Sequence, residues 1–130
     1  MIIKIMVKTS VIILVVLCCV NEPIDVSVHT GLYPTYSWNG GQAYSLRVLG
    51  DSAVVWAIYT PNQNKLVSPI LHGKKPSNAE LLLDPKIVGP VDTAAYDKGL
   101  VHGEKYNVLI MRTGSYSLGE FDFIADTTKD

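Results

Sequence analysis

The chain has 130 residues, of which 48% are hydrophobic and 18% are charged, and its formal net charge is −1. A charge so close to neutral argues against nucleic acid and anionic lipid as main partners, because both attract strongly basic surfaces. The length is enough for one domain with a single hydrophobic core.

The first 20 residues have the layout of a secretory signal peptide. Lys4 and Lys8 supply a positive amino-terminal region, and residues 11–17 (VIILVVL) supply an apolar stretch of the usual length. We therefore expect residues 1–20 to direct export, and residues 21–130 to form a domain that is secreted, periplasmic or at the cell surface. The alternative is an uncleaved membrane anchor, although the apolar run is about half as long as a bilayer-spanning helix needs.

Both cysteines, Cys18 and Cys19, lie at the end of this segment. The mature domain is therefore expected to contain no disulfide, so that its core alone must stabilise the fold. Cleavage after Cys18 would leave Cys19 as the first residue, the position that bacterial lipoproteins acylate, but the small residue usual before that cysteine is missing. Lipidation at Cys19 is a second alternative, and it would tether the protein to a membrane.

Alternation of apolar and polar residues predicts strands directly after the signal. Residues 24–28 alternate and place His29 on the solvent-exposed face, and residues 36–38 put two aromatic side chains on one side. Residues 39–41 (NGG) predict a turn, since glycine accepts positive φ without a steric penalty. Residues 44–48 then alternate again as a further strand.

Residues 53–59 are apolar on both sides, which predicts a central strand covered on both faces. The preceding residues 50–52 (GDS) are expected to form a hairpin connection. A turn at residues 61–64 leads into a short strand over residues 66–71, which Pro69 confines to the edge of a sheet.

The stretch between His72 and Gly103 has the weakest pattern. Residues 79–83 fit either a strand or one helical turn, and the prolines that follow break anything longer. Regular alternation returns at residues 106–111, which lead through a hairpin turn at residues 112–115 into the last strand.

Aromatic residues of the last strand change parity. Tyr116 and Leu118 are even-numbered, whereas Phe121 and Phe123 are odd-numbered, so we expect a β-bulge at residues 119–120 that returns both phenylalanines to the core. Strands at this spacing, without a long helical segment, predict an all-β fold: a single antiparallel β-sandwich, either jelly-roll or immunoglobulin-like.

One motif suggests catalysis. Residues 48–52 (VLGDS) look like the nucleophile block of the GDSL esterases, which pair that serine with a downstream Asp-x-x-His. Here His102 has Gly99 at the aspartate position, and a serine without a base and an orienting acid is an unactivated alcohol. A small serine hydrolase that uses Ser52 is therefore a remote alternative, and we expect no enzymatic activity.

Metal and cofactor sites have little support in the sequence. Each of the three histidines lacks a second histidine within four residues, and no cysteine remains in the mature domain to complete a zinc site. Asp92, Asp97 and Glu104 are candidates for a calcium site, but they lack the Asp-x-Asp spacing that would support one. We expect no metal and no cofactor.

Aromatic residues are the remaining candidates for binding. Tyr33, Tyr36 and Trp38 lie within six residues of one another beside the predicted NGG turn. Exposed aromatic faces next to amide groups hold sugars or peptides in many sandwich modules. The alternative is that Tyr36 and Trp38 belong to the core, where large aromatic residues are mostly found. Trp56, on the predicted central strand, is expected to be core.

Residues 55–66 resemble the strand-turn-strand of bacterial pre-peptidase C-terminal domains, in which an apolar strand ends in Tyr-Asp-Pro-Asn-Gly-Asn. Residues 103–110 and 114–118 are similar to the two closing strands of that family, Gly-x-Tyr-x-Val and Gly-x-Tyr-x-Leu. Thr60 and Gln63 depart from the family pattern. The resemblance implies a secreted, non-catalytic, jelly-roll-like module.

We therefore expect a secreted or surface-tethered module that binds an extracellular or envelope carbohydrate or protein, with Tyr33, Tyr36 and Trp38 as the contact residues. The alternative is a structural or assembly subunit that associates through its strand edges. A membrane is expected as a partner only through an amino-terminal anchor, and the sequence leaves the oligomeric state open.

Overall fold

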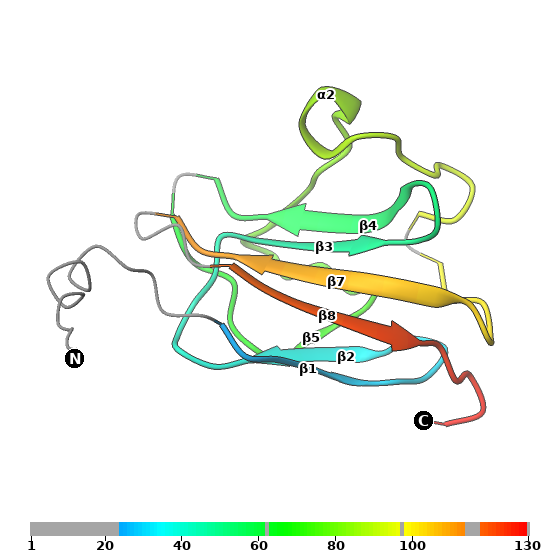
Figure 1. Cartoon of the computed structure of the whole chain (residues 1–130). Coiled ribbons are helices and arrows are strands. Elements are labelled where there is room, and N and C mark those ends of the chain that lie inside the picture. Colours follow the sequence, from blue (N-terminus) through cyan, green and yellow to red (C-terminus); the bar gives the residue numbers. More distant parts are fainter. Residues whose placement is uncertain (1–23, 62, 97, 114–117, 130) are drawn as a thin grey trace, which may run out of the picture.

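A computed structural model describes residues 24–61, 63–96, 98–113 and 118–129. These residues form a single β-sandwich of two antiparallel sheets (Figure 1), which confirms the predicted fold class. Within the described residues no helix is long and apolar enough to cross a membrane. The signal predicted at residues 1–20, including Cys19, lies outside the described part of the chain.

In the described part of the chain, three strands form the smaller sheet and five form the larger one. The smaller sheet has the order β1 (Val26–His29), β2 (Thr35–Trp38), β5 (Ile70–Leu71). The larger sheet has the order β6 (Glu80–Leu81), β4 (Val54–Tyr59), β3 (Ser45–Leu49), β7 (Lys105–Met111), β8 (Leu118–Ile124). A single helical turn, α2 (Pro85–Val88), follows β6.

Several predictions about individual elements are confirmed. His29 is exposed, and β5 lies at an edge of its sheet directly after Pro69. The GDS residues form the hairpin connection between β3 and β4, closed by a hydrogen bond of 2.8 Å from the Gly50 amide to the Ala53 carbonyl. Of the two readings for residues 79–83, the structure has the strand, as β6.

The core lies between the sheets and is made by alternate residues of the longer strands. In β7, Tyr106, Val108 and Ile110 are buried, while the residues between them are only partly buried. This alternation arises because successive side chains of a strand point to opposite faces. Trp56 of β4 is fully buried in the same core, as predicted.

Strand β4 is buried on both faces, also as predicted. Its inner face contributes to the core, and its outer face packs under the chain that follows β6. Val54 and Ala57 form a small second cluster there with Leu82, and Tyr96 donates a hydrogen bond of 2.6 Å to the Leu82 carbonyl. The stretch that was hardest to interpret from sequence thus covers the outer face of the sheet.

The predicted β-bulge at residues 119–120 is wrong. The pairing of β7 with β8 runs without interruption from Met111 opposite Leu118 to Lys105 opposite Ile124. No correction of register occurs: Leu118 is 50% exposed, Phe123 packs against the core, and Phe121, which the prediction also placed in the core, is 40% exposed. The structure has a register shift elsewhere, between Val48 and Leu49 in the pairing of β3 with β4.

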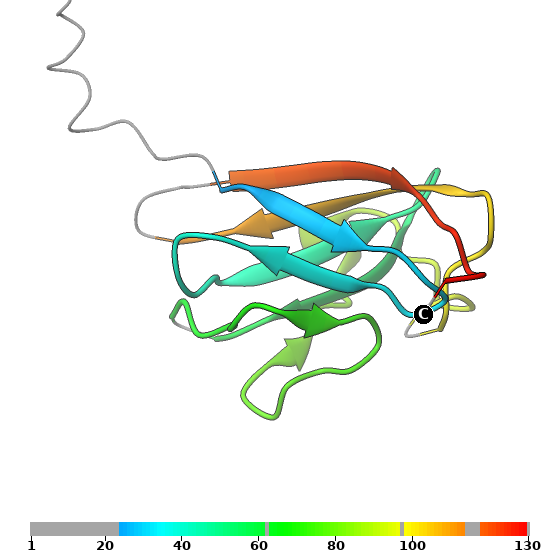
Figure 2. The ribbon, with the colours of Figure 1, turned by 90° about the horizontal axis from the view of Figure 1, so that it is seen from below.

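Strands β1 and β8 lie alongside each other where the two sheets meet (Figure 2). Gly119 is the point of closest approach, since a Cβ atom there would lie 2.4 Å from the Ile24 carbonyl oxygen and 2.8 Å from Val26 Cγ2. Both distances are far below van der Waals contact. A side chain at this position would force the sheets apart.

Replacing Gly119 by Ala is therefore expected to lower the free energy of unfolding by about 2 kcal/mol, because the added Cβ atom would meet the backbone of Ile24 rather than the end of a flexible side chain. Urea denaturation measures this change. The matched control is Leu118→Ala, at the neighbouring exposed position, with an expected loss below about 0.5 kcal/mol. Equal losses in the two variants would contradict the close contact of β1 with β8.

Candidate functional site

The three aromatic residues proposed as contacts do not form a joint surface. Tyr36 and Trp38 are buried on the inner face of β2, and the Trp38 indole donates a hydrogen bond of 2.8 Å to the Gly41 carbonyl. These two residues are core, as the alternative reading had it. Tyr33 is 49% exposed and stays the one predicted contact residue at the surface.

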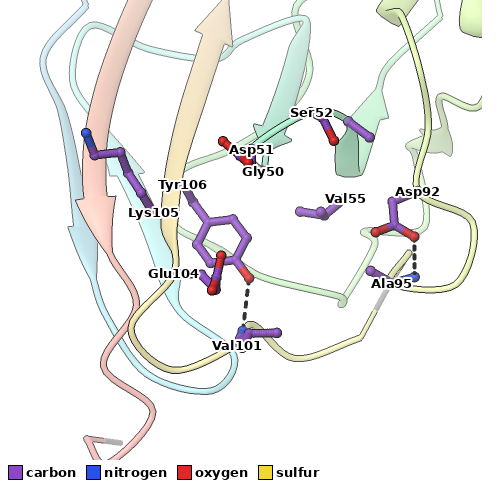
Figure 3. A pocket seen from close by; sticks show the side chains of 11 residues that line it. Gly50, Asp51, Ser52, Val55, Asp92, Ala95, Val101, Glu104, Lys105 and Tyr106 are labelled. Carbon is purple, nitrogen blue, oxygen red and sulfur yellow. Dashed lines mark hydrogen bonds between the residues drawn. The ribbon is translucent and has the colours of Figure 1, made fainter.

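A hollow of about 330 Å³ opens at one end of the sandwich, where β3 turns into β4 and where β7 begins (Figure 3). We call it the loop-end hollow. Its walls come from two stretches far apart in the chain: the hairpin at residues 50–53 and the loop that leads from Asp92 to Tyr106. Two smaller hollows, of about 190 and 250 Å³, adjoin it around Gly50 and Asp51.

Carboxylates outnumber cations in the lining. Asp51, Asp92 and Glu104 contribute three carboxylates, and Lys105 contributes one ammonium group. One oxygen of Asp92 already accepts hydrogen bonds from the Ala94 and Ala95 amides, at 3.2 and 3.1 Å. The Asp51 and Glu104 side chains are exposed and have no hydrogen-bond partner among the described residues. The hollow therefore presents free hydrogen-bond acceptors to a ligand.

The floor of the hollow is apolar. Val55 and the ring of Tyr106 are buried there. The Tyr106 hydroxyl accepts a hydrogen bond of 2.9 Å from the Val101 amide, so the floor also positions the loop wall (Figure 3). Charged walls over an apolar floor are usual for small binding sites in loops held by a rigid scaffold.

The same loop is attached to the core by a buried histidine. His72, only 1% exposed, lies with Nδ1 2.7 Å from the Tyr36 hydroxyl and with Nε2 3.0 Å from the Lys98 carbonyl oxygen. Burial lowers the pKa of His72 from 6.5 to about 4, so the ring is neutral near pH 7. The partners assign the tautomer: Nε2–H donates to Lys98, and Nδ1 accepts from the Tyr36 hydroxyl.

Ser52, the predicted nucleophile of the remote hydrolase alternative, lies in the lining of the hollow. No histidine is among the residues that line it. His102 lies with Nδ1 3.8 Å from Asp126 and accepts a hydrogen bond from the Thr127 amide. Among the described residues the hydroxyl of Ser52 thus has no histidine beside it to act as the base of a serine hydrolase, and a hydrolase mechanism gains no support from this geometry.

The acids considered for calcium are only partly brought together. Asp92 and Glu104 both line the hollow, whereas Asp97 lies outside the described residues. Among the residues that the structure describes, no group of three His, Cys, Asp or Glu side chains is placed to hold a metal ion.

Sequence reasoning singled out Asp92 and Glu104 for a metal and Ser52 for catalysis, but it missed the hollow that they share. It also missed His72, whose partners Tyr36 and Lys98 are distant in sequence. No local pattern marks either arrangement. Comparisons with known proteins gave no match: no protein-family model, no curated protein and no solved structure is significantly similar to this chain.

Proposed function

We propose that this protein is a non-catalytic β-sandwich module, exported to the cell surface or its surroundings, that binds a carbohydrate or protein ligand in the loop-end hollow. The observation that carries the proposal is the hollow itself, formed by two loops on one end of a rigid sandwich. The resemblance to pre-peptidase C-terminal domains and the signal-like residues 1–20 also favour an exported, non-catalytic module. Both stay predictions.

The lining restricts the chemistry of the ligand. Free carboxylate oxygens at Asp51 and Glu104 accept hydrogen bonds, and charge-assisted bonds of this kind are among the strongest in proteins. Sugar hydroxyls and the basic side chains of a protein segment both supply the matching donors. Asp51 and Glu104 take the place of the three aromatic residues as the contacts expected to matter most.

Replacing Asp51 by Asn and Glu104 by Gln together is expected to weaken ligand binding at least about tenfold, because each change removes the charge from one acceptor. The probes are a panel of oligosaccharides from extracellular polymers and a tetralysine peptide. Binding is measured by chemical-shift perturbation of the labelled protein. Shifts should appear at the amides of Ser52, Val101 and Lys105.

The matched control is Glu80→Gln, an acid of β6 that does not line the hollow and accepts a hydrogen bond of 3.4 Å from the Tyr59 hydroxyl. This variant should bind each probe like the wild-type protein. If a probe binds but its shifts cluster around Tyr33 or another face, or if the double variant keeps full affinity, the hollow is not the site.

The alternative of an assembly subunit depends on the edge strands. β8 is a seven-residue edge strand of the larger sheet, and Leu118, Phe121 and Ile124 on it are exposed. Antiparallel pairing of two β8 strands about Phe121 would place Glu120 of each copy opposite Asp122 of the other. Like charges in directly opposite positions destabilise a strand pair.

We therefore expect the protein to stay monomeric, with no self-association through β8, up to about millimolar concentration. Sedimentation velocity over a concentration series measures this. A dimer that substitutions in β8 disrupt would contradict this expectation and would favour the assembly alternative.

A further inference from the structure

The loop wall of the hollow is held at three successive points. The Lys98 carbonyl accepts from His72 Nε2, the Leu100 amide donates to the Leu32 carbonyl at 2.9 Å, and the Val101 amide donates to the Tyr106 hydroxyl. Val101 itself lines the hollow. The contact with His72 is the one of the three that involves a group able to change its charge between pH 4 and pH 7.

Among the described residues, no carboxylate is hydrogen-bonded to the His72 ring, and burial of the ring outweighs the one contact that favours its charged form, the hydrogen bond to the Lys98 carbonyl oxygen. The Tyr36 hydroxyl faces it from β2, and the Trp56 indole faces it from β4 with ring centroids 4.9 Å apart. The Lys98 side chain is exposed to solvent. From the described residues of the loop, the ring contacts the Lys98 carbonyl oxygen. A protonated ring would be a charge buried in the core without a carboxylate partner among the described residues.

We propose that His72 is an acid-sensitive anchor: on acidification its ring leaves the site between Tyr36 and the Lys98 carbonyl, residues 98–101 detach from the core, and the loop-end hollow loses one wall. The inference rests on the proposed function only for its consequence, which is release of the ligand in acid. The detachment itself is a property of the fold.

The expected size of the acid effect follows from the protonation equilibria of His72 in the closed and in the open form of the loop. In the closed form the pKa of His72 is about 4, whereas in an open form the solvated ring regains its ordinary value of 6.5. Between pH 7 and pH 4.5, linkage then raises the ratio of open to closed loop roughly fiftyfold.

Amide hydrogen exchange of the wild-type protein, without ligand, tests the detachment. Protection factors, which are corrected for the intrinsic effect of pH on exchange, should fall roughly fiftyfold for Leu100 and Val101 between pH 7 and pH 4.5. The amides of Tyr44 and Thr60, bonded within the sandwich, should stay far better protected at pH 4.5. Loss of protection at all four amides to one common level would mean unfolding of the whole domain and would overturn the proposal.

Two variants test whether the acid effect on the loop comes from His72. His72→Gln keeps a donor for Lys98 and cannot take up a proton, so its loop protection should not depend on pH. His102→Gln, at an exposed histidine, should respond like the wild type. An unchanged response in His72→Gln refutes the anchor. A further check needs no substitution. The pH at which half of the loop protection is lost should coincide with the titration of the His72 ring, followed by NMR. A midpoint that follows the titration of another group also refutes the anchor.

Failure of this proposal and failure of the proposed function give different results. If the loop detaches in acid but no probe binds the hollow, the anchor stands and the binding function falls. If probes bind with equal affinity at pH 7 and pH 4.5 and the loop stays protected, the hollow is a site but His72 does not control it.

Discussion

Replacement of Trp56 by Ala is expected to lower the free energy of unfolding by about 3–5 kcal/mol, as truncation of a large aromatic residue in a core usually does. Trp56 is fully buried in the strand that is covered on both faces, and its ring packs against that of His72. Its indole N–H has no hydrogen-bond partner among the described residues, so the loss would come from packing alone. Urea denaturation at pH 7.5 measures the change.

Tyr33→Ala is the matched control, because Tyr33 is an aromatic residue that is half exposed. Its loss is expected to stay below about 0.5 kcal/mol. Trp56→Phe, which leaves part of the ring volume in place, should fall between the two. The core described above would be incorrect if Trp56→Ala were no more costly than Tyr33→Ala.

Acidification is expected to remove about 3 kcal/mol of stability through His72 alone. The pKa of the buried ring lies near 4, below its ordinary value of 6.5, so the unfolded state binds the proton more tightly than the native state. The contribution of His72 to stability is therefore fully present above about pH 6.5, and it decreases as the pH falls from 6.5 to 4.

Carboxylates also titrate in part of this range, so the effect of His72 is obtained as a difference. The free energy of unfolding is measured from pH 7.5 to pH 4 for the wild type and for His72→Gln, and the wild type should lose about 3 kcal/mol more than the variant. Parallel curves for the two proteins would show that protonation of His72 does not affect stability.

Much of the fold could be predicted from sequence because strands leave a local signal. The alternation in residues 106–111, the two-sided apolar run before Tyr59 and the turn residues of the GDS hairpin each reflect interactions within a few residues. Such patterns fix which side chains share a face. They identified the sandwich, the central strand and the edge position of β5.

The same patterns failed where the outcome depends on which segments lie next to each other. Parity shows that Tyr36 and Trp38 share a side but not whether that side faces solvent, and the second sheet covers it. Parity likewise suggested a bulge near Gly119, whereas the strand simply begins with Leu118 facing outward.

The candidate site shows most clearly what the sequence determines and what the tertiary structure decides. By itself, the sequence determined the strands, the turns between them and the acidic and hydroxyl residues that the turns carry. Only the tertiary structure decided that a hairpin at residues 50–53 and a loop some 40 residues later enclose one hollow, and that His72 is buried beneath that loop. The reason is physical: packing of the two sheets brings together segments that are distant in the chain, and no local period records which of them will meet.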